Sequence, residues 1–364
     1  MNDAVRLSGW LRLALTPGIG GETQRKLLAA FGPPEGIFGA DFASVVSVIG
    51  EKPARTLLAT NQQPRIEAAL AWAAVEGRRI LTLGDSEYPS ALLEIADPPT
   101  VIYVLGEISL LQRPAIAVVG SRNPTAQGVR NAELFAAALS ESGLVVASGL
   151  ALGIDAAAHR STLAAGGETV AFIGTGIDRV YPSRNHDLAM EISRRGCIVS
   201  EFPLGTPAIA GNFPRRNRLI SGFSLGVLVV EAAPESGSLI TARLAAEQGR
   251  DVFAIPGSIH SPHSRGCHQL IKQGAKLVES VQDVLDELGP GGGASMSNSP
   301  GFAEGPAKPS ELLDLLGFDP CSIDELVGRS GLPVEVLSGK LLELALEGLL
   351  STLPGGRYQR ISPH

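Results

Sequence analysis

The sequence predicts an α/β protein whose core is a parallel sheet, with a smaller, mainly helical domain on each side of it. Between residues 108 and 288, apolar runs of four or five residues alternate with segments long enough for a helix, which is the pattern of βαβ units. Helical periodicity dominates before and after this region. With 364 residues, 44% of them hydrophobic, the chain is long enough for two or three domains of roughly 150 residues or fewer.

The central region, residues 76–289, carries the predicted sheet. Strands buried on both faces are apolar along their whole length, and this favours parallel strands covered by helices. Six runs have this character: Ala115–Val119, Leu144–Ala147, Thr169–Ile173, Cys197–Ser200, Val227–Glu231 and Val252–Ile255. Two earlier segments, Ile80–Leu83 and Val101–Leu105, are candidates for further strands of the same sheet.

Residues 1–75 are predicted to form a helical domain that contains a helix-hairpin-helix. Two helical segments are joined through the PGIG turn at Pro17–Gly20, and glycines in such a turn leave backbone N–H groups free to face a phosphate. A purely structural helical hairpin explains the same residues, because the glycines then serve only the turn. Both interpretations stay open.

A flexible linker and a winged-helix domain are predicted at the carboxyl end. Residues 290–309 are rich in proline, glycine and serine and lack apolar periodicity, which is typical of a linker. Residues 310–364 read as three short amphipathic helices and a small β-wing, with Ser322 and Glu325 as a capping box. The third helix repeats apolar residues at helical spacing, namely Val336, Leu337, Leu341, Leu344 and Leu349.

Charge and cysteine content restrict the function. The net charge of −7 differs from that of a protein coated with basic residues, so any contact with nucleic acid must come from a local cluster. The three cysteines are scattered and odd in number, which excludes a disulfide framework and suits a cytoplasmic protein. No apolar stretch approaches the roughly 18 residues of a membrane-spanning helix, so no membrane partner is expected.

Small and polar residues follow the predicted strands, where ligands gather on parallel sheets. Glycine lets a ligand approach the backbone, and N–H groups at the start of a helix bind anions. We expect these residues to form one anion-binding rim. Its members are Gly120, Ser121 and Arg122 after the first run, Ser148 and Gly149 after the second, Gly174 after the third, and Ser238 and Thr241 at a later helix start.

A basic cluster lies between the fourth and fifth runs, within GNFPRRNRLISGFS. It consists of Arg215, Arg216, Asn217 and Arg218. Pro214 fits the first turn of a helix, which puts these donors at the positive end of the helix dipole. Arginine binds phosphate with a planar, bidentate fork. We expect the basic cluster and Arg122 to face the same rim.

No cofactor and no metal are predicted. The segment GSRNPTAQG after the first run lacks the G-x-G-x-x-G fingerprint of dinucleotide enzymes, and the phosphate-binding loop of ATPases is missing as well. A zinc site is disfavoured because its candidate ligands are irregularly spaced and lack a carboxylate in their segment. These candidates are His260, His263, Cys267 and His268.

No catalytic residue is predicted. Asp155 and His159 are four residues apart in GIDAAAH, a spacing that brings two side chains to one helix face and resembles an acid/base pair. No nucleophile stands out near them. We interpret Asp155 as an acidic residue that opens a helix.

Taken together, the motifs resemble the DNA-processing protein A family, also called Smf. The matching segments are GSRNPT, SGLALGIDAAAH, GTGIDRVYPSRN, SEFPLG, FPRRNRLISG, VVEA, SGSLITA, EQGRDVFAIPG and GCHQLI, and they extend over about residues 110–280. The resemblance implies an extended Rossmann-like core, preceded by a sterile-alpha-motif-like helical domain and followed by a winged-helix domain.

The resemblance also implies a function. Family members are cytoplasmic homodimers that bind single-stranded DNA and load the RecA recombinase onto it during natural transformation. Arg122 and the basic residues of FPRRNR match the single-strand binding pocket of the family. The family often has lysine where this chain has Arg215, so the charge is kept while the donor geometry changes.

Two alternative functions fit parts of the sequence but are disfavoured. The lysine-decarboxylase-like (LOG-like) phosphoribohydrolases share this core and cleave nucleoside monophosphates, but their signature resembles PGGxGTxxE. Here the counterpart is ESGSLITARLAAEQ, where Ala242, Arg243 and Leu244 follow Thr241 and no glutamate holds the expected place. A function as a protein-interaction scaffold does not explain why arginines gather at the predicted anion-binding rim.

Overall fold

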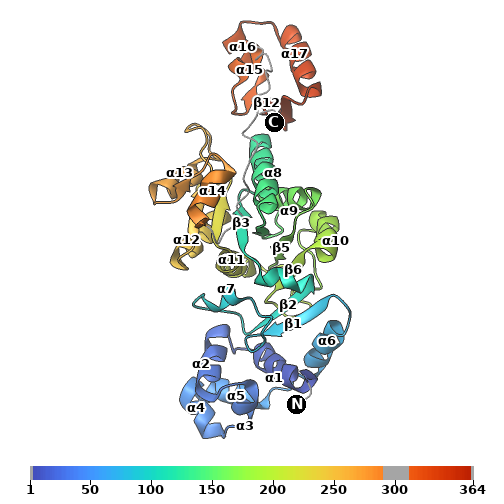
Figure 1. Cartoon of the computed structure of the whole chain (residues 1–364), viewed down its shortest axis with the longest axis vertical. Helices are drawn as coiled ribbons and strands as arrows, with labels where there is room; N and C mark the ends of the chain where they lie inside the picture. The colour runs from blue at the N-terminus through green and yellow to red at the C-terminus, as the bar shows by residue number, and fades with distance from the viewer. Residues whose placement is uncertain (1–2, 290–310, 362–364) are drawn as a thin grey trace.

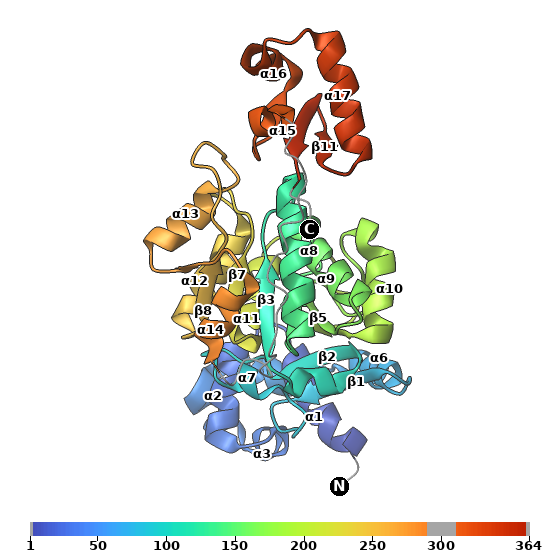
Figure 2. The same cartoon turned by 45° about the horizontal axis from the view of Figure 1, so that its top comes forward.

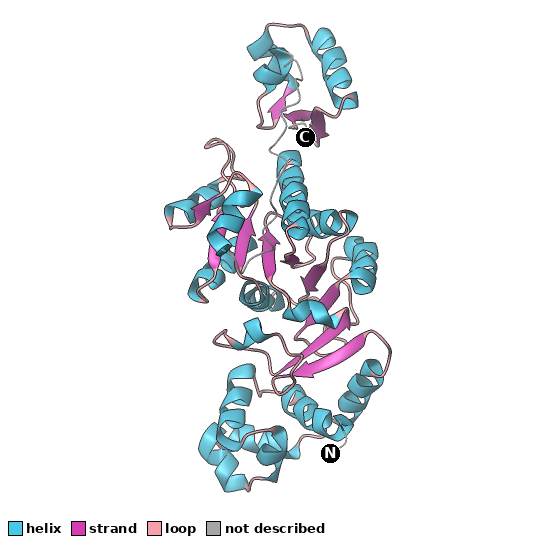
Figure 3. Ribbon diagram, in the orientation of Figure 1, coloured by secondary structure: helices cyan, strands magenta, loops and turns pink. Residues whose placement is uncertain are grey.

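The computed structural model describes residues 3–289 and 311–361 of the chain. Helices from the amino-terminal part lie at one end of the long axis, a strand-rich domain lies in the middle, and a small domain from the carboxyl-terminal part lies at the other end (Figure 1). Colouring by secondary structure separates the same three parts, because the long strands are confined to the middle (Figure 3). The predicted linker, residues 290–309, falls outside the described residues.

Six helices precede the sheet. Their bounds are α1 (Asp3–Leu15), α2 (Gly21–Phe31), α3 (Pro34–Gly39), α4 (Phe42–Ile49), α5 (Glu51–Ala59) and α6 (Gln63–Ala73). The helices α2 to α5, together with Leu13 of α1, enclose a small core around Leu27, Val45 and Leu57. Helices α1 and α6 also bury Trp10 and Ile66 against residues of the central domain. Helix α2 adds a hydrogen bond, in which the hydroxyl of Thr100 donates to Gln24 over 2.5 Å.

The central sheet has nine strands in the order β1-β2-β6-β5-β4-β3-β7-β8-β9. Their bounds are β1 (Arg78–Thr82), β2 (Val101–Gly106), β3 (Ala115–Val119), β4 (Val145–Ser148), β5 (Thr169–Phe172), β6 (Cys197–Ser200), β7 (Gly226–Val229), β8 (Asp251–Ala254) and β9 (Lys276–Leu277). The strands from β6 to β9 in this order are parallel, as predicted. The two early segments do extend the sheet, but β2 pairs antiparallel with β6 and β1 antiparallel with β2.

Helices cover both faces of the sheet, and alternate residues of each strand enter different cores. On β3, Ile116 and Val118 pack with α8 (Ala126–Glu141), α9 (Ile154–Ala164) and α14 (Val281–Leu288). Ala117 and Val119 face the opposite core, which is covered by α7 (Ser90–Leu93), α11 (Asn212–Phe223), α12 (Gly237–Glu247) and α13 (Arg265–Lys272). Helix α10 (His186–Arg195) packs against α9 and the strands β2, β5 and β6, and its Leu188 and Ile192 belong to the core that also holds Trp10 and Ile66. Figure 2 shows β3 with α8 on one side and the β7 and β8 region on the other.

The carboxyl-terminal domain is a winged helix. It contains α15 (Glu311–Leu316), β10 (Cys321–Ser322), α16 (Ile323–Ser330), α17 (Val334–Leu346), β11 (Leu350–Leu353) and β12 (Arg357–Arg360). The predicted capping box of Ser322 and Glu325 is confirmed at the start of α16. The domain contacts the start of α8, where the backbone N–H of Gln127 donates to Oε1 of Gln359 over 3.4 Å.

No helix within the two described ranges is long and apolar enough to cross a membrane.

Candidate nucleic-acid interface

A pocket at the carboxyl ends of the parallel strands brings several predicted site residues together. It has a volume of about 110 Å³. We call it the arginine-aromatic pocket, and define it by its lining residues Arg122, Gly149, Ala151, Leu152, Tyr181, Pro182, Phe213 and Arg216. Three of these, namely Arg122, Gly149 and Arg216, were predicted from the sequence. The loop after β3, the loop after β4 and the first turns of α11 thus meet at one point.

Two aromatic rings and an exposed guanidinium form the open side of the pocket. The rings of Tyr181 and Phe213 have centroids 5.5 Å apart and planes inclined by 43°. Cζ of Arg122 lies 5.9 Å from the centroid of Phe213, and the Arg122 side chain is exposed. Tyr181 remains 50% exposed, although a buried position is the usual one for a large apolar ring. A flat group can therefore reach the rings from solvent.

Arg216 forms the floor of the pocket. Only 4% of this residue is exposed, and its Nη1 donates to the carbonyl oxygens of Gly149, over 2.5 Å, and Phe172. Burial lowers the pKa of Arg216 to about 10, with the carboxyl of Asp155 opposing this shift and Arg122 adding to it. The guanidinium stays charged at neutral pH and is fixed in direction.

Gly149 allows this close packing. A Cβ atom at Gly149 would lie 2.6 Å from Nη1 of Arg216 and 2.7 Å from a carboxylate oxygen of Asp155, so no larger residue fits without displacing them. Asp155 opens α9 as predicted, and its carboxylate accepts from the backbone N–H groups of Gly149 and Ala151 over 3.2 Å each. Burial raises the pKa of Asp155, and Arg216 opposes the rise.

The loop that carries Arg122 is held by Glu231, the residue two positions after β7. The backbone N–H of Ser121 donates to the carbonyl oxygen of Glu231 over 2.8 Å. The Glu231 carboxylate accepts from the backbone N–H of Thr125 over 2.9 Å and from its hydroxyl over 2.5 Å. Thr125 also caps α8. These bonds fix both ends of the segment from which Arg122 projects.

The basic cluster is divided by helix α11, and only Arg216 enters the pocket. Arg215 has 53% of its side chain exposed and donates to Oε2 of Glu201 over 3.0 Å. Arg218 is 9% exposed, donates to the same oxygen over 2.5 Å, and pairs with Asp97 over 2.9 Å. The Glu201 side chain is 1% exposed. Arg218 is therefore neutralised inside the protein, whereas Arg215 keeps an exposed side.

The other predicted site residues lie around the pocket without lining it. Gly174 supports the ring of Phe213, because a Cβ there would lie 2.9 Å from Cδ1 of the ring. The hydroxyl of Ser148 is buried and donates to the carbonyl of Val118 over 2.7 Å. Gly120 precedes Ser121 at the end of β3. Asn217, Ser238 and Thr241 lie where α11 meets α12, and Ser238 and Thr241 are buried.

Tyr181 and Phe213, the aromatic members of the pocket, were not predicted from the sequence, and neither were the supporting roles of Glu201 and Glu231. Tyr181 lies in GTGIDRVYPSRN and Phe213 directly precedes Pro214, so both belong to segments that had been singled out for other reasons. The sequence signal that could have identified them is the position of an aromatic residue next to a basic or glycine-rich motif. Glu201 and Glu231 each follow a strand, and nothing in their sequence surroundings assigns them to a particular arginine or loop.

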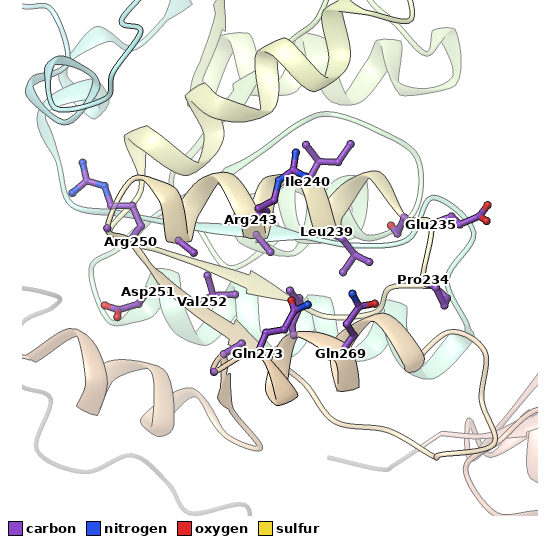
Figure 4. A pocket seen from close by; sticks show the side chains of 17 residues that line it. Pro234, Glu235, Leu239, Ile240, Arg243, Arg250, Asp251, Val252, Gln269 and Gln273 are labelled. Atoms are coloured by element: carbon purple, nitrogen blue, oxygen red, sulfur yellow. The ribbon is translucent and has the colours of Figure 1, made fainter.

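A second, larger cavity lies between α12 and α13, at the start of β8 (Figure 4). Its volume is about 850 Å³. Its charges balance, with Glu235 and Asp251 against Arg243 and Arg250, and Arg250 pairs with Glu94 over 2.6 Å. Since it offers no surplus of positive charge, this cavity is a poor site for a polyanion.

Three of the candidates for metal binding or acid/base chemistry have partners inside the protein, namely His159, Cys267 and His268. His268 Nε2 lies 2.9 Å from the carbonyl oxygen of Gly257, and Cys267 is buried. Nδ1 of His159 lies 2.6 Å from Oγ1 of Thr169, whose hydroxyl donates to the carbonyl of Val146. That geometry makes His159 the donor and places it in the core, away from the pocket.

Comparison with known proteins identifies relatives over most of the chain. The model of the family described as DNA recombination-mediator protein A matches residues 79–289, and that of the DprA winged helix domain matches residues 300–356. Protein Smf of Escherichia coli is 42% identical over 303 residues, which cover 81% of each chain. DNA processing protein DprA of Streptococcus pneumoniae is 50% identical over 204 residues, covering 56% of this chain and 72% of the relative.

Two solved structures are similar as well. The X-ray structure of DNA processing protein A from Streptococcus pneumoniae aligns with a TM-score of 0.70 and 37% identity, over 77% of this chain and 97% of that one. A structure of DNA processing protein A from Helicobacter pylori, described as giving insight into its single-stranded DNA binding mode, aligns with a TM-score of 0.53 and 32% identity. It covers 58% of this chain and 95% of that one.

Proposed function

Because the chain belongs to the DNA recombination-mediator protein A family, we propose that it binds single-stranded DNA in the arginine-aromatic pocket and acts in DNA processing. The observation that carries this proposal is the presence of guanidinium groups beside two neighbouring aromatic rings at one opening. Guanidinium groups bind phosphates, and aromatic rings stack with unpaired bases. The relative from Helicobacter pylori, whose title names single-stranded DNA, supports the same ligand.

Each part of the pocket has a role in this proposal. Arg122 is exposed and contacts a phosphate, while Arg216 supplies a fixed positive charge beneath it. The rings of Tyr181 and Phe213 receive a base, which requires a strand whose bases are unpaired. Arg215 extends the contact to a neighbouring phosphate through its exposed side. Phosphate contact and stacking are both tolerant of sequence, so we expect little sequence preference and a steep dependence on salt.

The remaining predicted site residues receive supporting roles. Gly120, Ser121, Gly149 and Gly174 shape the backbone that the DNA approaches, and Asn217 fixes the direction of Arg216 by accepting from its Nε over 3.2 Å. The other members of the predicted site are buried and hold the surrounding elements in place. These are Ser148, Arg218, Ser238 and Thr241.

The family relationship extends the proposal to partners. We propose a homodimer that protects incoming single-stranded DNA and loads RecA onto it in natural transformation or recombination, in the cytoplasm and without a cofactor. A dimer has two pockets. When a DNA strand is bound in one pocket, the second pocket meets the rest of that strand at a high effective concentration. Light scattering at micromolar concentration is expected to give about twice the chain mass of 37.8 kDa. A monomer would contradict the dimer without affecting the pocket.

We assign no catalytic activity. In the phosphoribohydrolase hypothesis a glutamate is needed near the start of α12, where this chain has buried Ala242 and exposed Arg243. Incubation with nucleoside monophosphates is therefore expected to release no free base. Release of base at a rate above that of a boiled sample would reinstate the enzyme hypothesis.

The proposal is tested by fluorescence anisotropy with matched single-stranded and double-stranded oligonucleotides at two salt concentrations. We expect tighter binding of the single strand and a loss of affinity as salt is raised, because ions are released when phosphates are neutralised. Equal affinity for both forms would contradict the proposal that the rings of Tyr181 and Phe213 receive an unpaired base. Absence of binding to either form would overturn the proposal.

A further inference from the structure

The winged-helix domain exposes an apolar stripe on its third helix, α17. Three leucines of α17, namely Leu337, Leu341 and Leu344, are buried in the core of the domain. On the outer side, Leu342 is 62% and Leu346 is 81% exposed. Leu346 is the most exposed large hydrophobic residue in the described part of the chain, and Leu342 lies one turn before it. Two adjacent exposed leucines differ from the single, scattered apolar residues that are normal on a surface. Val334 and Val336 are exposed as well, but they lie about 100° to either side of Glu335 and outside the stripe.

The stripe is bordered by acidic residues. At 3.6 residues per turn, Glu335, Leu342 and Leu346 lie within about 40° of one another around the helix axis. Glu343 and Glu347 follow along one flank, and all three glutamates are exposed. Lys340 is the single basic residue of α17. The exposed side of α17, defined as Glu335, Leu342, Glu343, Leu346 and Glu347, is hereafter the α17 face.

This composition is unsuited to DNA. In a winged helix that reads DNA, the third helix enters the major groove and meets phosphates on both sides of it. Three carboxylates against one ammonium repel those phosphates, and exposed leucines offer no hydrogen bonds to base edges. The whole domain has the same bias, since residues 311–361 contain 8 Asp and Glu and 4 Lys and Arg.

Self-association of the α17 face is disfavoured by the same charges. Two copies of this face brought together about a twofold axis would oppose glutamate to glutamate, which is destabilising. The partner must therefore carry the opposite charge. Figures 1 and 2 show α17 along the outer side of its domain, and its principal contacts within the described residues are with α16 and β11.

We propose that the α17 face is a docking site for a basic amphipathic helix of a protein partner. An apolar stripe with positions one turn apart is matched by a helix with anchors at i, i+3 or i+4 and i+7. Lysine or arginine beside those anchors pairs with Glu335, Glu343 and Glu347. Gly339 adjoins the stripe, and a Cβ there would have no neighbour within 4 Å, so a partner backbone can approach closely.

The test uses the full chain and a fluorescent peptide of about 18 residues, or five helical turns, built from leucine and lysine with the leucines on one helical face. Two control peptides are a scrambled order of the same residues and a version with glutamate in place of lysine. Two double variants each change one feature of the α17 face. Leu342→Ser with Leu346→Ser removes the apolar stripe. Glu343→Lys with Glu347→Lys reverses the charge along its flank. All four positions are exposed, so folding is expected to persist, and thermal unfolding checks it.

We expect the amphipathic peptide to bind the wild-type chain with micromolar affinity, and both variants to lose about tenfold or more. The two control peptides should bind no better to the wild-type chain than to the variants. Single-stranded DNA affinity should be the same for all three proteins, which separates this surface from the arginine-aromatic pocket. Equal peptide binding by wild type and variants would overturn the proposal. It would also be overturned if the leucine variant lost duplex DNA binding, or if either variant changed the oligomeric mass instead, because the face would then serve DNA or a second copy.

Discussion

Arg218 donates a hydrogen bond of 2.5 Å from Nη2 to Oε2 of Glu201, and both side chains are almost completely buried. Arg215, three residues earlier, donates to the same oxygen from a half-exposed position. One carboxylate therefore supports two arginines with different exposures. Burial raises the pKa of Glu201, and the two arginines oppose the rise. The relationship predicts separate consequences for the two arginines when each is removed.

Replacement of Arg218 is expected to damage the fold and leave DNA contact intact. Arg218→Ala leaves Glu201 buried with one partner fewer, and breaking a buried ion pair in this way costs about 3 kcal/mol or more. Urea unfolding should report this loss. The salt dependence of single-strand binding by the remaining folded protein should match wild type, because no phosphate contact is removed. Unchanged stability with a reduced salt slope would show that Arg218 contacts DNA after all.

Removal of the exposed ring of the pocket is expected to weaken binding without changing its salt dependence. Tyr181→Ala deletes one of the two rings, and stacking of a base on an aromatic side chain contributes roughly 1–3 kcal/mol. Tyr181→Phe is the matched control, since it keeps the ring and removes only the hydroxyl. Anisotropy titrations should show a loss of about tenfold for alanine and near wild-type affinity for phenylalanine. Equal affinities of the two variants would exclude stacking at this position.

The stability of the protein is expected to fall as the pH drops below about 6.5, in part because of His159. Burial lowers the pKa of His159 to about 3 in the folded protein, from 6.5 ordinarily. Only the unfolded chain then takes up a proton between these values, so this contribution is complete above pH 6.5 and declines as the pH falls. At pH 5 the loss amounts to about 2 kcal/mol.

His159→Asn isolates that contribution, since asparagine can still donate to Thr169 but does not titrate. Urea unfolding of both proteins at pH 7.5 and pH 5.0 gives the comparison. The decrease in unfolding free energy between the two pH values should be smaller in the variant by about 2 kcal/mol. An identical decrease in both proteins would mean that His159 is accessible to protons in the folded state.

Truncation after Gly289 is expected to leave single-strand affinity within tenfold of the full chain. The third helix of the winged-helix domain carries acidic residues, and the contact of this domain with α8 includes a hydrogen bond of 3.4 Å between Gln127 and Gln359. Neither feature contributes to the arginine-aromatic pocket. Anisotropy with the same oligonucleotide checks the expectation. A loss greater than tenfold would assign DNA contact to the winged helix.

The strands of the sheet could be predicted because burial on both faces demands continuous apolar runs, such as Ala115–Val119. The antiparallel direction of β1 and β2, at one edge of the sheet, could not be predicted. A short apolar run such as Val101–Leu105 has the same composition whether it pairs parallel or antiparallel, and no local pattern between β1 and β2 signals the reversal. The winged helix was predictable in detail, because caps and helical spacing are local signals.

The basic cluster illustrates where sequence reasoning stops. Four consecutive residues on a helix point in directions about 100° apart, so Arg215, Arg216 and Arg218 cannot all meet one ligand. Which of them enters the pocket depends on where Glu201 and Asp97 lie, and these residues come from other segments of the fold. The composition gave no indication of the two rings either. Aromatic residues are only 5% of the chain, but two of them are in contact at this pocket.

The central claim is that Arg122 and Arg215 contact phosphates of one single strand, and salt titration beside thermal unfolding tests it most directly. Arg122→Ala and Arg215→Ala should each weaken binding to all sequences alike, with melting temperatures close to wild type. Each should lower the slope of log affinity against log salt by up to roughly 0.7, the value for one lost single-strand phosphate contact. Unaltered slopes with depressed melting temperatures would contradict the claim, because they would make both arginines structural.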